Sequence, residues 1–132
     1  MPIVKVDLND ASGAEQIGIL IREAIAKKRL EIAMTALQQV AVISPVYTGR
    51  LRMGWDPSVN VPSEYIPPEG VYPMPDISIR ATQAWENAQL ADTLYITNNV
   101  PYAVMVNNGT VKMAPRRFVE RTISVISQLY SG

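Results

Sequence analysis

Arginine and a large aromatic residue occur together twice in this chain, once in residues 50–55 and once in residues 116–118. Guanidinium groups can contact phosphates while aromatic rings stack on bases, so one interpretation is a contact with single-stranded nucleic acid. Contacts with carboxylates or backbone carbonyls of a neighbouring protein fit better, because arginine and large aromatics are the usual anchors of protein interfaces. The residues concerned are Arg50, Arg52, Trp55, Arg116, Arg117 and Phe118.

The residue types needed for catalysis are scarce. The chain has no histidine and no cysteine, which excludes a Ser-His or Cys-His nucleophile system and removes the commonest soft metal ligands. Its twelve carboxylates form no closely spaced acidic pair of the kind that binds hard cations. There is also no glycine-rich phosphate loop. We therefore expect no enzyme, no cofactor and no metal site.

Composition is that of an ordinary folded domain. The 132 residues are 48% hydrophobic and 18% charged, which suits one domain with a modest core. Twelve basic and twelve acidic residues balance, so the net charge gives no reason to expect a polyanionic partner. No apolar run approaches the roughly twenty residues that span a bilayer, and the first residues do not resemble a signal peptide. We expect a soluble protein made in a cytoplasm, with no membrane contact.

Residues 14–43 predict a long helix leading into the first arginine run. Ser12 and Glu15 have the spacing of a capping box at its start, and Pro45 predicts its end because proline cannot continue a helix. The apolar residues of the two halves lie on nearly opposite faces, and the change falls at residues 27–29. Either the halves bury opposite faces against different partners, which would indicate an oligomer, or the helix kinks within one subunit.

The first residues alternate between apolar and polar side chains. Val4, Val6 and Leu8 share one side of an extended chain, which predicts a short strand or an extended arm. An arm docking on a neighbouring subunit and a strand in the home sheet are equally compatible with so few residues. We therefore assign residues 1–12 to an arm or short strand of a single domain covering the whole chain.

Residues 56–76, the proline-rich segment, contain six of the ten prolines. Such a segment cannot be a helix or a central strand, so we predict an extended loop, with an edge strand possible at 58–61. Loops of this length in compact domains are usually functional or disordered. The aromatic and aliphatic residues of the loop indicate docking on a partner surface, and they are Tyr65, Ile66, Val71 and Tyr72.

The elements that follow the proline-rich segment are short. Alternation at residues 77–80 predicts a strand, and the apolar spacing over 81–88 predicts a helix anchored by Trp85. Residues 93–97 are β-branched or aromatic almost throughout and form the clearest strand. The two asparagines that follow predict a turn, because asparagine tolerates left-handed backbone.

The last part of the chain, from residue 102 onward, predicts a short element of uncertain type, then a turn, then a helix. Residues 102–106 fit either one or two helical turns or a strand, and residues 107–110 predict a turn. A helix is predicted from Arg116 onward, packing on the sheet or on the long helix. Its expected apolar face consists of Val119, Thr122, Ile123, Ile126 and Leu129.

Three stretches, taken in order and at their spacing, resemble the neck and tail-completion proteins of long-tailed bacteriophages. The hinge stretch, residues 44–55, resembles the sequence that follows the first helix in those proteins. The strand-turn stretch, residues 94–103, resembles their strand ending in Asn-Asn-x-Pro-Tyr-Ala. The loop stretch, residues 107–115, resembles the run before their last helix. Tyr47 and Asn107 depart from the usual pattern, in which aspartate and glutamate stand at these positions.

The resemblance implies a structural role in the virion. Such proteins form rings around the DNA channel at the head–tail junction or at the upper end of the tail. They complete or terminate the tail and help to join it to the filled head. We would expect a ring with six copies, partners among other neck and tail proteins, assembly in the bacterial cytoplasm, and DNA passing without specific binding.

The sequence therefore predicts an α+β domain, with a long N-terminal helix and a C-terminal helix packed on a small, mostly antiparallel sheet. The alternative function is a nucleic-acid-binding accessory module that uses Arg50, Arg52, Arg116 and Arg117. The residues expected to form interfaces or structural motifs are Thr48, Gly49, Arg50, Arg52, Trp55, Tyr65, Tyr72, Asn99, Pro101, Tyr102, Gly109, Thr110, Pro115, Arg116, Arg117 and Phe118.

Overall fold

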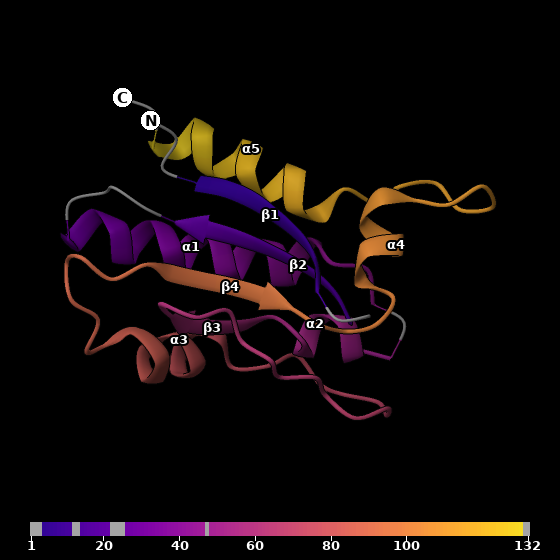
Figure 1. Ribbon diagram of the computed structural model, residues 1–132, viewed down its shortest axis with the longest axis horizontal. Coiled ribbons are helices and arrows are strands. Elements are labelled where there is room, and N and C mark those ends of the chain that lie inside the picture. The colour runs from indigo at the N-terminus through magenta and orange to yellow at the C-terminus, as the bar shows by residue number, and fades with distance from the viewer. Residues whose placement is uncertain (1–3, 12–13, 22–25, 47, 131–132) are drawn as a thin grey trace.

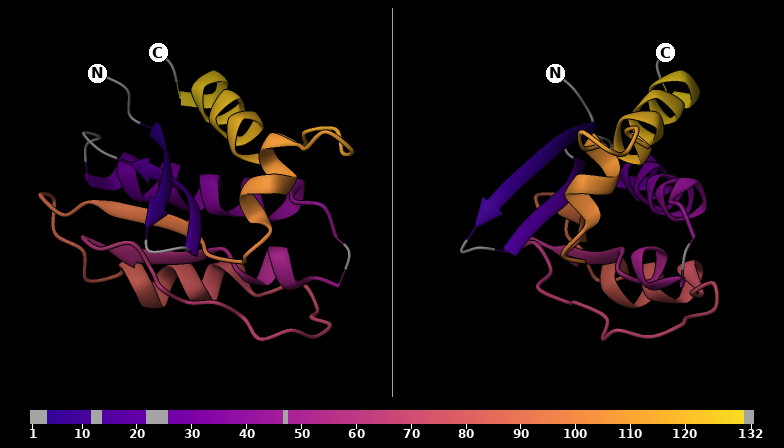
Figure 2. Two further views of the ribbon diagram at one scale, coloured as in Figure 1. Left: turned by 45° about the vertical axis from the view of Figure 1, so that its right-hand side comes forward. Right: turned by 90° about the vertical axis from the view of Figure 1, so that its right-hand side faces the viewer.

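A four-stranded antiparallel sheet packed against helices forms the framework of the molecule (Figure 1). The computed structural model describes residues 4–11, 14–21, 26–46 and 48–130. Helices α1, α3 and α5 lie on one side of the sheet, as the two turned views in Figure 2 show. The arrangement confirms the predicted α+β class.

The described part of the chain contains four strands and five helices. The strands are β1 (Val4–Ala11), β2 (Ala14–Ile21), β3 (Asp56–Val59) and β4 (Leu94–Asn98), and their order in the sheet is β1-β2-β4-β3. The helices are α1 (Ala26–Ile43), α2 (Arg50–Met53), α3 (Ile77–Trp85), α4 (Ala103–Asn108) and α5 (Phe118–Tyr130).

The prediction of a single helix over residues 14–43 is wrong in its first half, because residues 14–21 form strand β2. Ile17, Ile19 and Ile21 are all buried, which is the two-residue period of a strand and not a helical stripe. A side chain at Gly18 would put its Cβ 2.9 Å from the Ile96 carbonyl oxygen of neighbouring strand β4. Glycine therefore allows the close approach of the two strands.

The apparent change of face at residues 27–29 marks the start of a new element, since helix α1 begins at Ala26. The opposed apolar faces therefore belong to a strand and a helix, and they no longer indicate an oligomer. Ser12 of the expected capping box lies outside the described residues, and Glu15 lies within β2. Of the two alternatives for the N-terminus, the home-sheet strand is confirmed, because β1 pairs with β2 from Val4 to Ala11.

Helix α1 supplies the centre of the core. It ends at Ile43, as Pro45 predicts, and the Ser44 amide still donates to the Val40 carbonyl oxygen at 3.1 Å. Its buried face packs between the sheet and helix α5 (Figure 2). The buried residues of this face are Ile32, Ala33, Ala36, Leu37, Val40 and Ala41.

The predicted strand at residues 77–80 is wrong, because helix α3 already begins at Ile77. Asp76 caps the helix, with Oδ1 accepting a hydrogen bond from the Ile79 amide at 3.0 Å. An N-cap aspartate satisfies an amide that the first helical turn leaves unpaired. The alternation that predicted a strand reflects the helix surface, since Ile77 is buried and Ile79 is 54% exposed. Trp85 is buried, as predicted.

The short edge strand begins two residues earlier than expected. Strand β3 starts at Asp56 and ends at Val59, because Asn60 adopts a positive φ of 65° and turns the chain. Pro57 is tolerated because β3 lies at the edge of the sheet. Strand β4 confirms the strand predicted at residues 93–97, shifted by one position.

The C-terminal helix begins at Phe118, two residues later than predicted. Arg117 has a positive φ of 51°, so it cannot belong to the helix. The helical alternative for residues 102–106 is confirmed, because α4 begins at Ala103 with Tyr102 as its N-cap residue. The face expected to be apolar is correct at Val119 and Ile126, but Leu129 is 61% exposed. In the described residues no helix has both the length and the apolar character required to cross a bilayer.

Candidate interaction site around the hinge stretch

The hinge stretch turns the chain from helix α1 into strand β3, and Trp55 anchors it. The Trp55 side chain is completely buried, and its Nε1 donates to the Ser44 hydroxyl at 2.8 Å. The Phe118 ring meets the Trp55 ring edge-on, with centroids 5.8 Å apart. Trp55 and Phe118 are therefore core residues, and neither ring is available to stack on a base.

Arg50 and Arg52 both bind backbone carbonyls of their own chain. Arg52 Nε donates to the Ala41 carbonyl oxygen at 2.9 Å, and its Nη2 donates to Val42 at 3.4 Å. These are among the last carbonyls of α1, which have no partner within the helix. Arg50 Nε donates to the Pro67 carbonyl oxygen at 2.8 Å. The prediction that these arginines contact protein is consistent with this geometry, with their own chain as the partner.

Gly49 lets the proline-rich segment lie directly on the hinge stretch. It adopts a φ of 87°, and a Cβ at this position would lie 2.2 Å from the Tyr72 carbonyl oxygen. The Tyr72 amide in turn donates to the Thr48 carbonyl oxygen at 2.7 Å. The Tyr72 hydroxyl donates to the Pro68 carbonyl oxygen at 2.6 Å, which closes the tip of the segment. Thr48, Gly49 and Tyr72 therefore form one structural joint.

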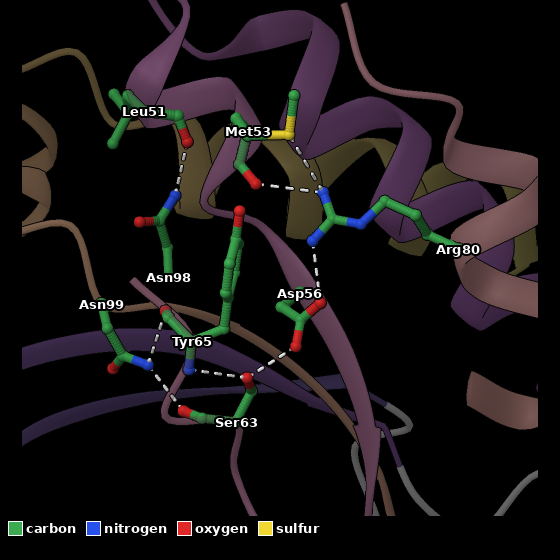
Figure 3. Close-up of polar contacts among 8 residues, drawn as sticks. All are labelled: Leu51, Met53, Asp56, Ser63, Tyr65, Arg80, Asn98 and Asn99. Atoms are coloured by element: carbon green, nitrogen blue, oxygen red, sulfur yellow. Dashed lines mark hydrogen bonds and ion pairs between the residues drawn. The ribbon is translucent and has the colours of Figure 1, made fainter. Parts of the chain in front are cut away.

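Two asparagines at the end of β4 hold the hinge stretch and the proline-rich segment (Figure 3). Asn98 Nδ2 donates to the Leu51 carbonyl oxygen at 2.7 Å. Asn99 Nδ2 donates to the carbonyl oxygens of Ser63 at 2.6 Å and of Tyr65 at 3.4 Å. Both asparagines are buried, so each amide replaces the water that these carbonyls would otherwise bind.

An ion pair that the sequence did not suggest completes the joint. Arg80 Nη2 lies 2.7 Å from Asp56 Oδ1, and Arg80 Nη1 donates to the Met53 carbonyl oxygen at 3.0 Å. The other carboxylate oxygen accepts from the Ser63 hydroxyl at 2.6 Å. The Arg80 guanidinium also lies 5.7 Å from the centre of the Tyr65 ring (Figure 3). Asp56 and Arg80 thus tie α2, β3, α3 and the proline-rich segment together.

The proline-rich segment presents apolar side chains to solvent even though its backbone is fixed. Pro67 and Pro75 are buried, whereas Val71 is 85% exposed. A fixed backbone lowers the entropy cost of binding a partner, and exposed apolar residues in a group mark interaction surfaces. The inner side of the segment contacts its own chain, and docking of its exposed side on another surface stays a prediction. The exposed apolar residues are Val61, Tyr65, Ile66, Val71 and Met74.

The loop stretch forms a projecting turn between α4 and α5 (Figure 1). Gly109 ends α4 with a φ of 81°, and a Cβ there would lie 2.7 Å from the Pro115 nitrogen. The Thr110 amide donates to the Met113 carbonyl oxygen at 2.8 Å. Asn107 is buried and caps α5, with Oδ1 accepting from the Val119 amide at 3.0 Å. Asn107 therefore has a structural role at the start of α5.

The other residues that the sequence predicted as interface or structural residues lie apart from the hinge stretch. The Arg116 and Arg117 amides donate to the carbonyl oxygens of Val106 and Asn107, while both arginine side chains are exposed. Pro101 is exposed and Tyr102 is half-buried, at the start of α4. The four arginines therefore do not act alike, because two guanidinium groups bind backbone carbonyls and two side chains are exposed.

Arg29 and Asp92 stabilise the loop that leads into β4. The buried Arg29 guanidinium donates to the carbonyl oxygens of Gln89, Leu90 and Asp92. The Asp92 carboxylate accepts from Asn60 Nδ2 at 2.9 Å and from the Gln89 amide at 2.7 Å. The hydrogen bond from Asn60, with that from Gln89 and the charge of Arg29, lowers the pKa of Asp92 below its ordinary value.

No grouping of three or more potential metal-ligating side chains occurs among the described residues. No protein-family model, curated protein or solved structure matches this chain. The functional argument therefore rests on the residues themselves and on their arrangement.

Proposed function

We propose that this chain is a structural protein of the neck or tail end of a long-tailed bacteriophage. In this role it completes or terminates the tail and helps to join the tail to the head, as one subunit of a ring. The observation that supports the proposal is the direct packing of the hinge stretch on the strand-turn stretch, two of the three stretches that carry the resemblance. The hydrogen bond from Asn98 to Leu51 joins these two, and the contact of Trp55 with Phe118 joins the hinge stretch to the helix that follows the loop stretch.

Close packing at Gly54 supports the same grouping. A Cβ at Gly54 would lie 2.6 Å from Val100 Cγ2 and 2.7 Å from Asn98 Oδ1. The short Gly-Trp end of the hinge stretch therefore fits directly against the strand-turn stretch. Two of the three stretches that resemble the family pattern are thus in direct contact, although Leu51 and Asn98 are 47 positions apart in sequence.

The surface suits a protein that contacts other proteins and lets DNA pass. Several polar side chains of the joint bind their own backbone, which leaves apolar and charged side chains outside for partner contacts. The net charge of zero avoids a strongly positive channel that would retain DNA. The proposed partners are further copies of the chain, with six expected in the ring, and the neck and tail proteins above and below it in the virion.

A phage mutant that lacks this chain tests the proposal. We expect its lysates to contain DNA-filled heads and separate tails, because the joining step needs the completed tail end. Electron microscopy of the lysate measures the ratio of joined to separate particles. Supplying the chain in trans is the control and should restore joined particles. Normal, infectious particles in the absence of the chain would contradict the proposed function.

A further inference from the structure

Exposed charges of opposite sign are segregated between two parts of the described structure. The proline-rich segment and the residue that follows the end of α3 carry four exposed carboxylates, which we call the acidic face. The turn before α5 and the first turns of α5 carry four exposed cations, which we call the basic face. The acidic face consists of Glu64, Glu69, Asp76 and Glu86, and the basic face consists of Lys112, Arg116, Arg117 and Arg121.

The two faces belong to opposite sides of the molecule. In Figure 1, α5 and the turn before it lie at the top, whereas α3 and the proline-rich segment lie at the bottom. The views in Figure 2 are turned about the vertical axis, and they keep the same separation, with the sheet and α1 between. The faces therefore cannot neutralise each other within one molecule.

Each face also exposes apolar side chains beside its charges. Val111 is fully exposed next to Lys112, and Met105 is 46% exposed on α4. On the acidic face, Tyr65 and Val71 are exposed between Glu64 and the start of α3. A phosphate backbone is bound through cations and hydrogen-bond donors and does not cover exposed aliphatic side chains, whereas a protein partner can also bury apolar area. The composition of both faces thus favours a protein partner.

We propose that the acidic face of one copy binds the basic face of the next copy, so that the chain associates head to tail with itself. The charges are complementary, and the two faces are different surfaces, which defines a heterologous contact. Such a contact continues from copy to copy until it closes into a ring or extends as a filament. Closure into a ring rests on the proposed function.

The fixed backbone of the acidic face strengthens this assignment. Arg50, Asn99 and the Tyr72 amide hold the proline-rich segment in place before any partner arrives. A partner surface that is ordered in advance loses less entropy on binding. Because exposed charges dominate both faces, association should be faster and tighter at low ionic strength and should weaken as salt screens the charges.

Paired charge reversals test the proposal by sedimentation velocity on the purified chain at low salt. The acidic variant is Glu64→Lys with Glu69→Lys, and the basic variant is Arg116→Glu with Arg121→Glu. Arg117 is left unchanged because its backbone turns the chain into α5 with a positive φ, and two reversals already change the sign of half the basic face. We expect each variant alone to raise the dissociation constant for self-association about tenfold or more, because like charges then face each other.

The combined variant with all four reversals distinguishes complementary contact from general damage. It should associate within about threefold of the parent chain, because each face again meets the opposite charge. Glu31→Lys is the control, since this exposed residue on α1 belongs to neither face, and it should leave association unchanged. Circular dichroism of each variant checks that the fold is retained.

A parent chain that remains monomeric throughout would overturn the proposal, and so would a combined variant that fails to regain association. Duplex DNA binding lost in the basic variant, with self-association unchanged, would assign the basic face to nucleic acid and also overturn it. If the charge reversals leave self-association unchanged and the chain is present at the phage neck, the acidic and basic faces are not the contact surfaces, while the proposed neck function stands. If the charge reversals change self-association as expected but the chain is absent from virions, the neck function is rejected, while the head-to-tail contact stands.

Discussion

Ser44 and Trp55 make the buried polar contact on which the hinge stretch depends. The Trp55 Nε1 donates to the Ser44 hydroxyl, and both side chains are shielded from water. Ser44→Ala leaves the indole N–H buried without its partner, so we expect the free energy of unfolding to fall by about 1–3 kcal/mol. Urea denaturation measures this change.

Ser124→Ala is the matched control for this prediction. Ser124 is exposed on α5, and its truncation should change the free energy of unfolding by no more than about 0.5 kcal/mol. Equal effects of the two substitutions would show that the contact between Ser44 and Trp55 does not stabilise the fold.

The Asp92 carboxylate should make the stability of the fold against unfolding depend on pH. Its folded pKa lies below the ordinary value of 3.8, mainly through the hydrogen bond from Asn60. The ionised carboxylate therefore stabilises the fold at pH values above about 3.8, and this contribution is lost as the pH falls through the folded pKa. Asp92→Asn should lower the midpoint of thermal unfolding at pH 7, and the difference from the parent should shrink at pH 3.

Glu69→Gln provides the comparison for the acid measurement, because Glu69 is an exposed carboxylate of the proline-rich segment. Thermal unfolding followed by circular dichroism at pH 7, 5 and 3 gives the midpoints for all three chains. If the thermal midpoints of Asp92→Asn and the parent differ by the same amount at pH 7 and pH 3, the ionised Asp92 carboxylate does not stabilise the fold as proposed.

At the scale of elements, the proline-rich segment is held by a close contact that only glycine allows. Gly49→Ala would bring a Cβ within 2.2 Å of the Tyr72 carbonyl oxygen and impose a strained φ. We expect a loss of more than about 1 kcal/mol of unfolding free energy and faster cleavage within residues 56–76 in limited proteolysis. Gly70→Ala is the control, because a Cβ there meets only the Tyr72 ring at 3.8 Å or more. Equal cleavage rates in both variants would contradict this role for Gly49.

The sequence predicted the fold class, the end of α1, strand β4 and the buried position of Trp85. It did not predict strand β2, because Ile17 and Ile21 also fit a helical spacing. What decides between the two is the pairing of β2 with β1 and with β4. That pairing joins residues far apart in sequence, which a local period cannot reveal. The strand expected at residues 77–80 is absent because Asp76 caps a helix that begins at Ile77.

The candidate site was predictable only where its residues carry a local signal. Gly49 and the prolines mark a turn and an extended segment by their backbone preferences alone. The pairing of Asp56 with Arg80 has no such signal, since the two residues are 24 positions apart and on different elements. The backbone carbonyls that Arg50 and Arg52 bind are equally invisible in a sequence, because every residue has one.

At the scale of the whole molecule, one unit joins the hinge and strand-turn stretches, and two oppositely charged faces are exposed. The hydrogen bonds of Trp55, Asn98 and Asn99 fix the hinge stretch, the strand-turn stretch and the proline-rich segment relative to the sheet. The acidic and basic faces then lie on opposite sides of this rigid frame (Figures 1 and 2). A neutral chain with separated charges is suited to contacts between identical copies, where each positive surface meets a negative one.

The most direct test of the central claim is immunogold electron microscopy of purified phage particles with antibodies against this chain. The neck assignment predicts gold at the junction between head and tail, and at the upper end of tails that have not yet joined a head. Particles that carry no label, together with the absence of the chain from their protein content, would contradict the claim.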